Sequence, residues 1–201
     1  QYKKKAAANR ELRLEKTATG EIIVMPPTGG STGRRNFNLA GQLFVWNERS
    51  QLGIAFDSST AFHLPNGADH SPDVAWVRRE KWEALTREQQ DDFSPICPNF
   101  VIELRSKTDS MKPLREKMQE YLENGLQLGW LIDPKNRVVE IYRANREVEI
   151  LQNSTHHIGG RYFARVCFGF TNYIYLNISP ILPDRRLQIT GILKRSAMVT
   201  I

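Results

Sequence analysis

Short apolar runs separated by polar segments predict a domain in which helices flank a β-sheet. Residues 74–77, 99–106 and 128–133 are each built around such a run. These runs are typical of strands that are buried on both faces of a sheet. The segment at 137–143 instead alternates apolar and polar positions, which predicts a strand with one buried face.

A long amphipathic helix is predicted over residues of about 34–51, and Gly53 follows its end. The residues that recur at three- and four-residue intervals, and so share one face, are Phe37, Ala40, Leu43 (or Phe44) and Asn47.

A second helix is predicted over 111–124, between the second and third buried strands. Ser110 is its candidate cap, Pro113 lies in its first turn and Gly125 follows its end. The order strand, helix, strand implies a right-handed crossover and therefore a parallel pair of strands.

The N-terminal part of the chain reads as a β-hairpin. One strand passes through Leu14, Gly20 closes the turn and residues 21–25 form the second strand. Residues 3–10 are weakly helical, and 26–33 form a loop rich in proline and glycine.

Between the two long helices, residues 54–64 offer two short strands, and Thr86 with Gln89 forms a capping box for a short helix. No internal repeat is present. Together these elements predict an α/β fold in which helices flank a mixed β-sheet, with an N-terminal hairpin and helix.

Composition limits the class of protein more than the function. A chain of 201 residues with 40% hydrophobic and 25% charged residues suits one soluble domain with appendages. No apolar run approaches the roughly 20 residues that span a bilayer. Cys97 and Cys167 lie too far apart to suggest a disulfide framework, so a reducing cytoplasm is expected.

The net charge of +6 is unevenly distributed. Basic residues are in excess in 1–16 and 153–201, which leaves a net charge of −3 for 17–152. The bulk charge therefore does not by itself predict DNA binding.

Two acids are placed for metal chemistry. Asp73 directly precedes the first buried strand, and Glu103 lies near the end of the second. If these strands are neighbours, the two carboxylates meet at one edge of the sheet. Paired carboxylates repel each other unless a divalent cation lies between them, and oxygen ligands suit Mg²⁺, with Mn²⁺ as a substitute. Such a metal polarises a phosphodiester and activates water.

Two cations are candidates to work beside the acids. Arg105 follows Glu103 by two residues and is expected on the same face of the strand. Lys117 lies on the second helix, at the border of the stripe that Leu114 and Tyr121 place toward the sheet.

Each of these residues also has a structural interpretation. Asp73 can cap a turn, Glu103 can form a salt bridge with Arg105 or Lys117, and a helical lysine can extend its amine into solvent.

Five segments carry a resemblance to a known family. They read ANRELRLEKTATGEIIVMPPTGG, SPDVAWVRREKWEALT, CPNFVIELRSKTDSMKPLREKMQEYLENG, LGWLIDP and VEIYR. They closely resemble the cyanobacterial Uma-two family of proposed restriction endonucleases, in the PD-(D/E)XK nuclease superfamily. The resemblance covers roughly residues 8–152.

The resemblance implies a restriction-endonuclease-like core and a site that binds metal and activates water. Asp73 would be the D and Glu103 the (D/E) of the motif, while Arg105 stands where the family pattern has lysine. Arginine is a poor proton acceptor. Related nucleases move the lysine to the neighbouring helix, which makes Lys117 the candidate, with Lys107 a weaker rival.

Four further residues are less informative. His63 and His70 flank the Asp73 strand without a spaced partner and are expected at the surface or in structural roles. Asn38, on the first long helix, and Glu15, on the hairpin, are candidates to point into the site.

The resemblance and the residues together predict a Mg²⁺-dependent DNA endonuclease, cytoplasmic and homodimeric, whose domain spans 1–152. Residues 153–201 depart from the family pattern, being rich in aromatics and nearly free of acids, and are expected to pack on or extend that domain. The alternatives are a catalytically degenerate nuclease fold that acts as a nucleic-acid-binding or scaffold module, and a purely structural acid–base cluster in another enzyme.

Overall fold

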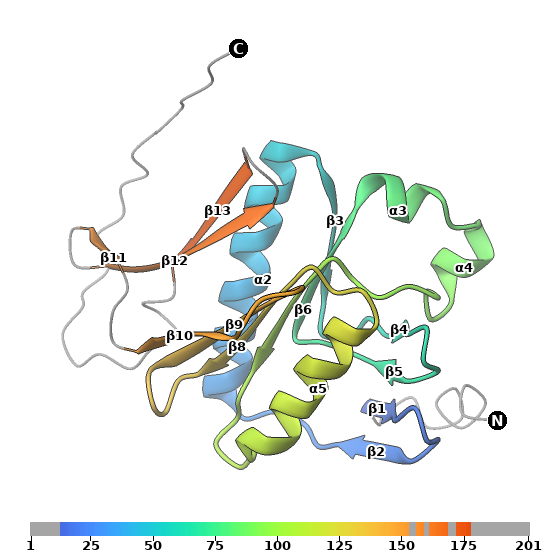
Figure 1. Cartoon of the computed structure of the whole chain (residues 1–201), viewed down its shortest axis with the longest axis horizontal. Coiled ribbons are helices and arrows are strands. Elements are labelled where there is room, and N and C mark those ends of the chain that lie inside the picture. Colours follow the sequence, from blue (N-terminus) through green and yellow to red (C-terminus); the bar gives the residue numbers. More distant parts are fainter. Residues whose placement is uncertain (1–12, 153–155, 159–160, 169–171, 178–201) are drawn as a thin grey trace.

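A six-stranded mixed sheet forms the centre of the protein (Figure 1). The computed structural model describes residues 13–152 and the strands at 156–158, 161–168 and 172–177. The central sheet has the order β10-β9-β8-β7-β6-β3. Its strands are β3 (Gly53–Asp57), β6 (Val74–Arg78), β7 (Phe100–Leu104), β8 (Leu128–Asp133), β9 (Val138–Arg143) and β10 (Glu149–Gln152). The predicted α/β fold with a mixed sheet is confirmed.

One pair of strands in this sheet is parallel. β7 runs parallel to β8, as the strand–helix–strand order predicted. β6 runs antiparallel to β7, with Val74 opposite Ile102. The start of β6 therefore lies beside the end of β7.

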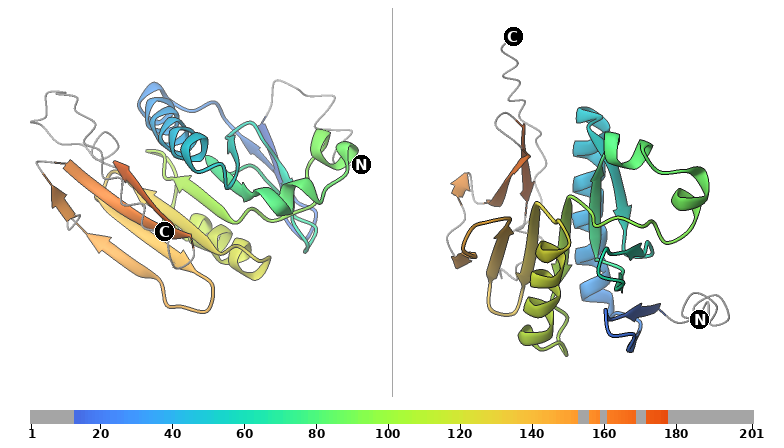
Figure 2. Two further views of the ribbon diagram at one scale, coloured as in Figure 1. Left: turned by 90° about the horizontal axis from the view of Figure 1, so that it is seen from above. Right: turned by 45° about the vertical axis from the view of Figure 1, so that its right-hand side comes forward.

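Two helices cover opposite faces of the sheet (Figure 2). On one face, Leu39 and Leu43 of α2 (Gly30–Ser50) pack in a core that includes Trp76. On the other face, Met118 and Tyr121 of α5 (Met111–Glu123) pack in a second core, under the opposite side of the same strands. This division explains why β6, β7 and β8 are apolar on both faces.

The helix α2 begins at Gly30, four residues before the predicted start, so the loop before it is shorter than predicted. The spacing grouped Phe37 with Leu43 on one face, but Phe37 is 81% exposed while Leu39 and Leu43 are fully buried. Apolar residues occur on both faces of α2, so the spacing alone could not select the buried one. Asn47 is buried, and its Oδ1 accepts a hydrogen bond from the Trp76 indole at 2.8 Å.

A smaller sheet joins the N-terminal hairpin to the segment before β6. Its order is β2-β1-β5-β4. Its strands are β1 (Arg13–Lys16), β2 (Ile22–Met25), β4 (Phe62–His63) and β5 (Asp69–His70). The predicted hairpin of β1 and β2 is confirmed. The pattern did not predict β5, because a two-residue strand carries no periodicity.

The segment after β6 forms two short helices, α3 (Arg79–Glu83) and α4 (Arg87–Asp91). The predicted capping box of Thr86 and Gln89 is present at the start of α4. The predicted cap Ser110 does precede α5, but its side chain makes no capping hydrogen bond.

The alternating sequence of β9 predicted one buried face. In the structure both faces of this strand are buried. Its Glu140 is buried because Arg115 of α5 and the hydroxyl of Tyr142 bind its carboxylate. The half-exposed Arg115 of α5 thus covers a carboxylate on the side of β9 that was expected to face solvent.

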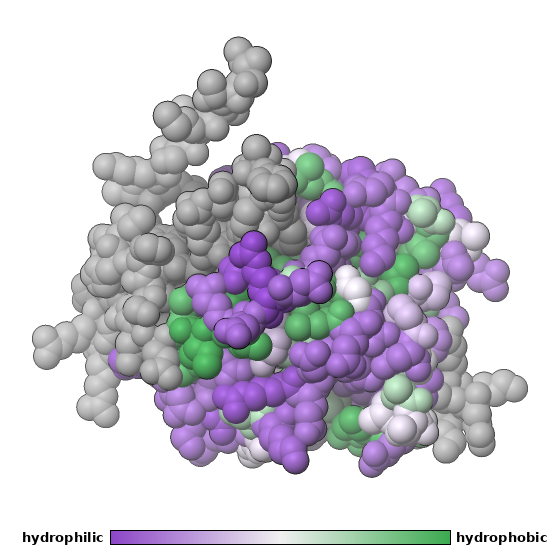
Figure 3. Space-filling model, in the orientation of Figure 1, coloured by the Kyte–Doolittle hydropathy of each residue, from purple (hydrophilic) through white to green (hydrophobic). Residues whose placement is uncertain are grey.

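Beyond β10, the strands β11 (His156–Ile158), β12 (Arg161–Phe168) and β13 (Asn172–Asn177) form a three-stranded antiparallel sheet. The predicted helix at 3–10 lies outside the described residues, and the domain boundary at 152 stays a prediction. The face that carries α5 is mainly hydrophilic (Figure 3). None of the helices in the described part of the chain has the length and apolar character that a bilayer requires.

Candidate active site

The pairing of β6 with β7 brings the two predicted acids to one edge of the sheet. Asp73 stands just before β6, and Glu103 is the fourth residue of β7. The Asp73 Oδ2 atom accepts a hydrogen bond of 2.8 Å from the backbone N–H of Leu104, the residue after Glu103. The antiparallel register thereby converts a separation of thirty residues in the chain into proximity.

Asp73 has polar partners from two other elements. Its Oδ1 accepts a hydrogen bond of 2.7 Å from Asn36 on α2 and lies 4.0 Å from the guanidinium of Arg13 on β1. Arg13 is itself held by the backbone oxygen of Ser71, at 2.5 Å. Burial raises the pKa of Asp73, and the Leu104 N–H and the Arg13 charge only partly offset that effect.

Glu103 is buried, and two side chains of α5 bind it. Its Oε1 lies 2.8 Å from the Lys117 ammonium and accepts a hydrogen bond of 3.2 Å from the Tyr121 hydroxyl. Burial raises the pKa of Glu103 to about 7; Lys117 opposes this shift, and the negative charges of Asp73 and Glu15 add to it. A cation at this edge would relieve the repulsion between the acids.

The Lys117 ammonium lies between two carboxylates, 2.8 Å from Glu103 and 2.9 Å from Glu15. Burial alone would lower the pKa of Lys117, but the two carboxylates outweigh it and the pKa is raised. The side chain is therefore a fixed cation that contributes positive charge to the site and does not accept a proton in this arrangement. The solvated alternative for Lys117 is excluded, because its amine is held inside the protein.

Glu15 and His70 extend this arrangement away from the sheet edge. The Glu15 Oε1 accepts a hydrogen bond of 3.0 Å from the backbone of Ser71, and its Oε2 lies 3.1 Å from the His70 Nδ1. The His70 Nε2 lies 2.6 Å from Glu120 on α5. Burial acts to raise the pKa of Glu15, but Lys117 and His70 lower it to about 2. A surface position for His70 is wrong, since it is 3% exposed.

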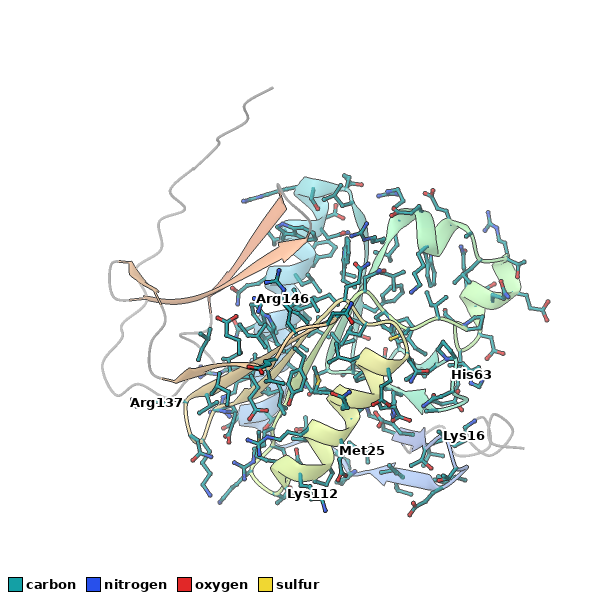
Figure 4. The ribbon with its side chains drawn as sticks, in the orientation of Figure 1. Lys16, Met25, His63, Lys112, Arg137 and Arg146 are labelled. Atoms are coloured by element: carbon teal, nitrogen blue, oxygen red, sulfur yellow. The ribbon has the colours of Figure 1, made fainter. Side chains whose placement is uncertain are left out.

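A cleft of about 1220 Å³ opens over these residues. The β1–β2 hairpin and the start of α2 line one side of it, and the segment 106–110 with α5 lines the other. Met25, at the end of β2 (Figure 4), lines this cleft together with Pro113 and Leu114 of α5. Asp73, Glu103 and Lys117 all line this cleft, so the two predicted acids and the helical lysine border one hollow.

Arg105 does not join this group. Its guanidinium lies 2.7 Å from Asp133 and donates to the backbone oxygen of Asp109 at 3.0 Å. The residues that line the cleft do not include it, although they include Lys107. β7 ends at Leu104, so the two-residue alternation that placed Arg105 beside Glu103 does not continue.

The residue of α2 that reaches the site is Asn36, and not Asn38 as predicted. The Asn38 amide donates to the backbone oxygen of Arg34, one turn earlier on the same helix. Helical residues two positions apart point in different directions, so an uncertain helix phase changes which asparagine faces the acids.

The donor set fits a Mg²⁺ ion held by Asp73 and Glu103. Both are carboxylates, and the Oε2 of Glu103 accepts no hydrogen bond from any of the described residues. No group of three or more histidine, cysteine, aspartate or glutamate side chains within the described residues could hold a metal. Mg²⁺ keeps several waters and commonly takes one or two carboxylates, so two acids suffice.

Comparisons with known proteins agree with the fold and the family. The model of the Uma2 family, described as "Putative restriction endonuclease", matches residues 1–165. The chain belongs to the Uma2 family. A crystal structure of a "putative nuclease belonging to DUF820" from Anabaena variabilis superposes with a TM-score of 0.61 and 21% sequence identity. That match covers 71% of this chain and 78% of the other, and it shows a shared fold. No curated protein matches the chain.

Proposed function

We propose that this Uma2 protein is a Mg²⁺-dependent endonuclease that hydrolyses phosphodiester bonds of DNA. The observation that carries the proposal is that Asp73, Glu103 and the Lys117 ammonium meet in one cleft at the sheet edge. The family supports a nuclease in general, and the donor set supports the metal. A cytoplasmic location and a homodimer stay predictions from the sequence.

In this proposal each residue has a separate task. Asp73 and Glu103 would hold the metal, which when bound would polarise the phosphodiester and lower the pKa of a water. Asn36 and the Leu104 N–H fix the Asp73 carboxylate in place. Lys117 supplies a fixed positive charge beside the attacked phosphate, where it stabilises the negative charge that develops.

Cleavage of supercoiled plasmid DNA tests this function. We expect nicked and linear products with Mg²⁺ or Mn²⁺ and none with EDTA. The variants Asp73→Asn and Glu103→Gln should each abolish cleavage. A control variant, Asp57→Asn, changes an acid at the end of β3 that lies outside the residues lining the cleft, and it should cleave normally. Cleavage that survives both site variants would show that another site or a contaminant acts.

The second candidate function is a non-catalytic nuclease fold that binds nucleic acid or serves as a scaffold. It is favoured by Arg105, which replaces the motif lysine and is engaged with Asp133 instead of the acids. This candidate predicts no cleavage with any divalent metal but retained binding to DNA in a mobility-shift assay.

A further inference from the structure

Glu15, on the hairpin strand β1, places a buried carboxylate beside Lys117, the lysine that the proposed reaction uses. Lys117 has two acidic partners, and they differ in what else they do. Glu103 is the candidate metal ligand, so its charge is shared once a metal is bound. Glu15 contacts neither Asp73 nor Glu103 through a hydrogen bond, and it gives Lys117 a partner that is independent of the metal.

Glu15 is held by donors on both oxygens. Its Oε1 accepts hydrogen bonds from Lys117 and from the Ser71 N–H, and its Oε2 faces His70. These partners come from two places in the fold: Lys117 lies on α5, while His70 and Ser71 are consecutive residues at the end of β5. The carboxylate therefore cannot rotate without losing at least one partner in a buried site, which is costly.

His70 connects this carboxylate to a second acid. Its two ring nitrogens face two acceptors, the Glu15 Oε2 at 3.1 Å and the Glu120 Oε2 at 2.6 Å. Because carboxylates only accept hydrogen bonds, both contacts are satisfied when both ring nitrogens carry a proton. Glu120 is in turn fixed by the side chain of Asn66, whose Nδ2 donates to its Oε1 at 2.7 Å.

Glu120 and Lys117 lie three residues apart on α5, so they are neighbours on one face of the helix. The contacts therefore form a closed ring: Lys117 to Glu15, Glu15 to His70, His70 to Glu120, and Glu120 back to Lys117 through the helix backbone. Because the ring closes through α5, it fixes both the direction of the Lys117 side chain and its distance from Glu15.

We propose that Glu15 and His70 are positioning residues that hold the Lys117 ammonium at the attacked phosphate when Glu103 is engaged by the metal. This inference rests on the proposed nuclease function. It follows from the contacts of Lys117 with both Glu15 and Glu103, and from the ring of contacts that fixes Glu15. Without Glu15, the ammonium would have Glu103 as its one acidic partner, and its position would depend on a carboxylate that the metal also uses.

Steady-state cleavage of an oligonucleotide duplex tests the proposal. Glu15→Gln should lower kcat by about 10- to 100-fold, the usual effect of losing a group that supports a metal-site residue, and leave KM within about twofold. His70→Phe should act in the same direction, while His70→Gln, which keeps one donor, should retain more of kcat. His63→Gln is the matched control. That histidine pairs with Asp69 on the neighbouring strand and lies outside the residues lining the cleft.

A second measurement separates this proposal from the function on which it rests. The side-chain ¹⁵N signal of the Lys117 ammonium in the metal-free protein, assigned with Lys117→Arg, should be sharp and slow to exchange. Glu15→Gln should broaden it or accelerate its exchange, whereas His63→Gln should not. If the unaltered protein does not cleave DNA, the nuclease function fails but this signal still tests the positioning role. An unchanged signal together with an unchanged kcat in Glu15→Gln would overturn it.

Discussion

At the scale of single residues, the two candidate cations of the motif have separate partners. Lys117 contacts the acids of the cleft, whereas Arg105 contacts Asp133, at the end of β8. Both are ion pairs with little exposure, but only one can act on a ligand in the cleft. Arg105, at the motif position in the sequence, therefore lies away from the acids of the cleft, whereas Lys117 lies beside them.

Lys117→Ala is expected to lower the cleavage rate by about 10²- to 10³-fold, since it removes a preorganised charge at the reacting centre. Lys112→Ala on the exposed side of the same helix is the control, and it should cleave normally. Because Lys117→Ala leaves Glu15 and Glu103 buried without their shared cation, it should also lower the melting temperature, and rates must be measured well below it. A rate equal to that of the unaltered protein would show that another residue supplies the charge assigned to Lys117.

Arg105→Ala should mainly affect stability. It removes a charged hydrogen-bond partner of the buried Asp133, which costs about 1.5–3 kcal/mol in free energy of unfolding. Urea denaturation measures this loss, and cleavage at a temperature where the variant is folded should remain within a few-fold. If Arg105→Ala lost more cleavage than Lys117→Ala, the charge at the reacting centre would be assigned to Arg105 and not to Lys117.

The free energy of unfolding should depend on pH through His70. Burial lowers the pKa of His70, whereas the contacts with Glu15 and Glu120 raise it. The net shift of this pKa is upward. Lys117 and Tyr121 also face the ring, and Lys117 opposes the shift. Because the pKa of His70 is higher in the folded protein, His70 contributes its full stabilisation at pH values below its unfolded pKa of about 6.5. That stabilisation is lost as the pH rises through the folded pKa. Urea denaturation across this range should show a decline that is absent in His70→Gln.

At the scale of elements, the close packing of β3 against β6 explains why a glycine stands at the start of β3. Gly53 opens β3 opposite Arg78 of β6. A Cβ atom at this glycine would collide with the backbone oxygen of Val77 and the ring of Trp76. The absence of a side chain at this position lets the edge strand approach the sheet.

Gly53→Ala should therefore lower the free energy of unfolding by about 1–3 kcal/mol, the usual cost of overpacking. Gly41→Ala is the control, because a Cβ there meets no neighbouring atom and favours the helix α2. Thermal denaturation of both variants measures the difference. A Gly53→Ala variant as stable as the unaltered protein would show that β3 can shift outward without cost.

At the scale of the whole molecule, the site joins segments from across the chain. The hairpin supplies Glu15, the two central strands place Asp73 and Glu103, and α5 supplies Lys117. Metal binding should consequently stabilise the fold as a whole, since a ligand that binds only the folded state shifts the unfolding equilibrium.

Titration with Mg²⁺ or Mn²⁺ should raise the melting temperature of the unaltered protein. Asp73→Asn and Glu103→Gln should each abolish that increase, whereas Asp57→Asn should keep it. Differential scanning fluorimetry with and without EDTA provides the measurement. An increase that persists in both site variants would place the metal elsewhere.

The sequence by itself determined the central strands, the parallel crossover and the two candidate acids that meet at the sheet edge. The buried strands are apolar at almost every position, and the segments that resemble the family span them. A charged residue within such a run, as with Glu103, is conspicuous because isolated burial of a carboxylate is unfavourable. These features depend on local composition, which a linear pattern contains.

Only the tertiary structure decided which cations and supporting residues join the acids. Arg105 left the group because β7 ends one residue earlier, and Asn36 replaced Asn38 because the phase of α2 depends on which of its apolar faces is buried. His70 became part of the site through Glu15 and Glu120, which lie 55 and 50 residues away in the chain. Contacts at such separations arise from packing between elements, and no periodicity within one element specifies them.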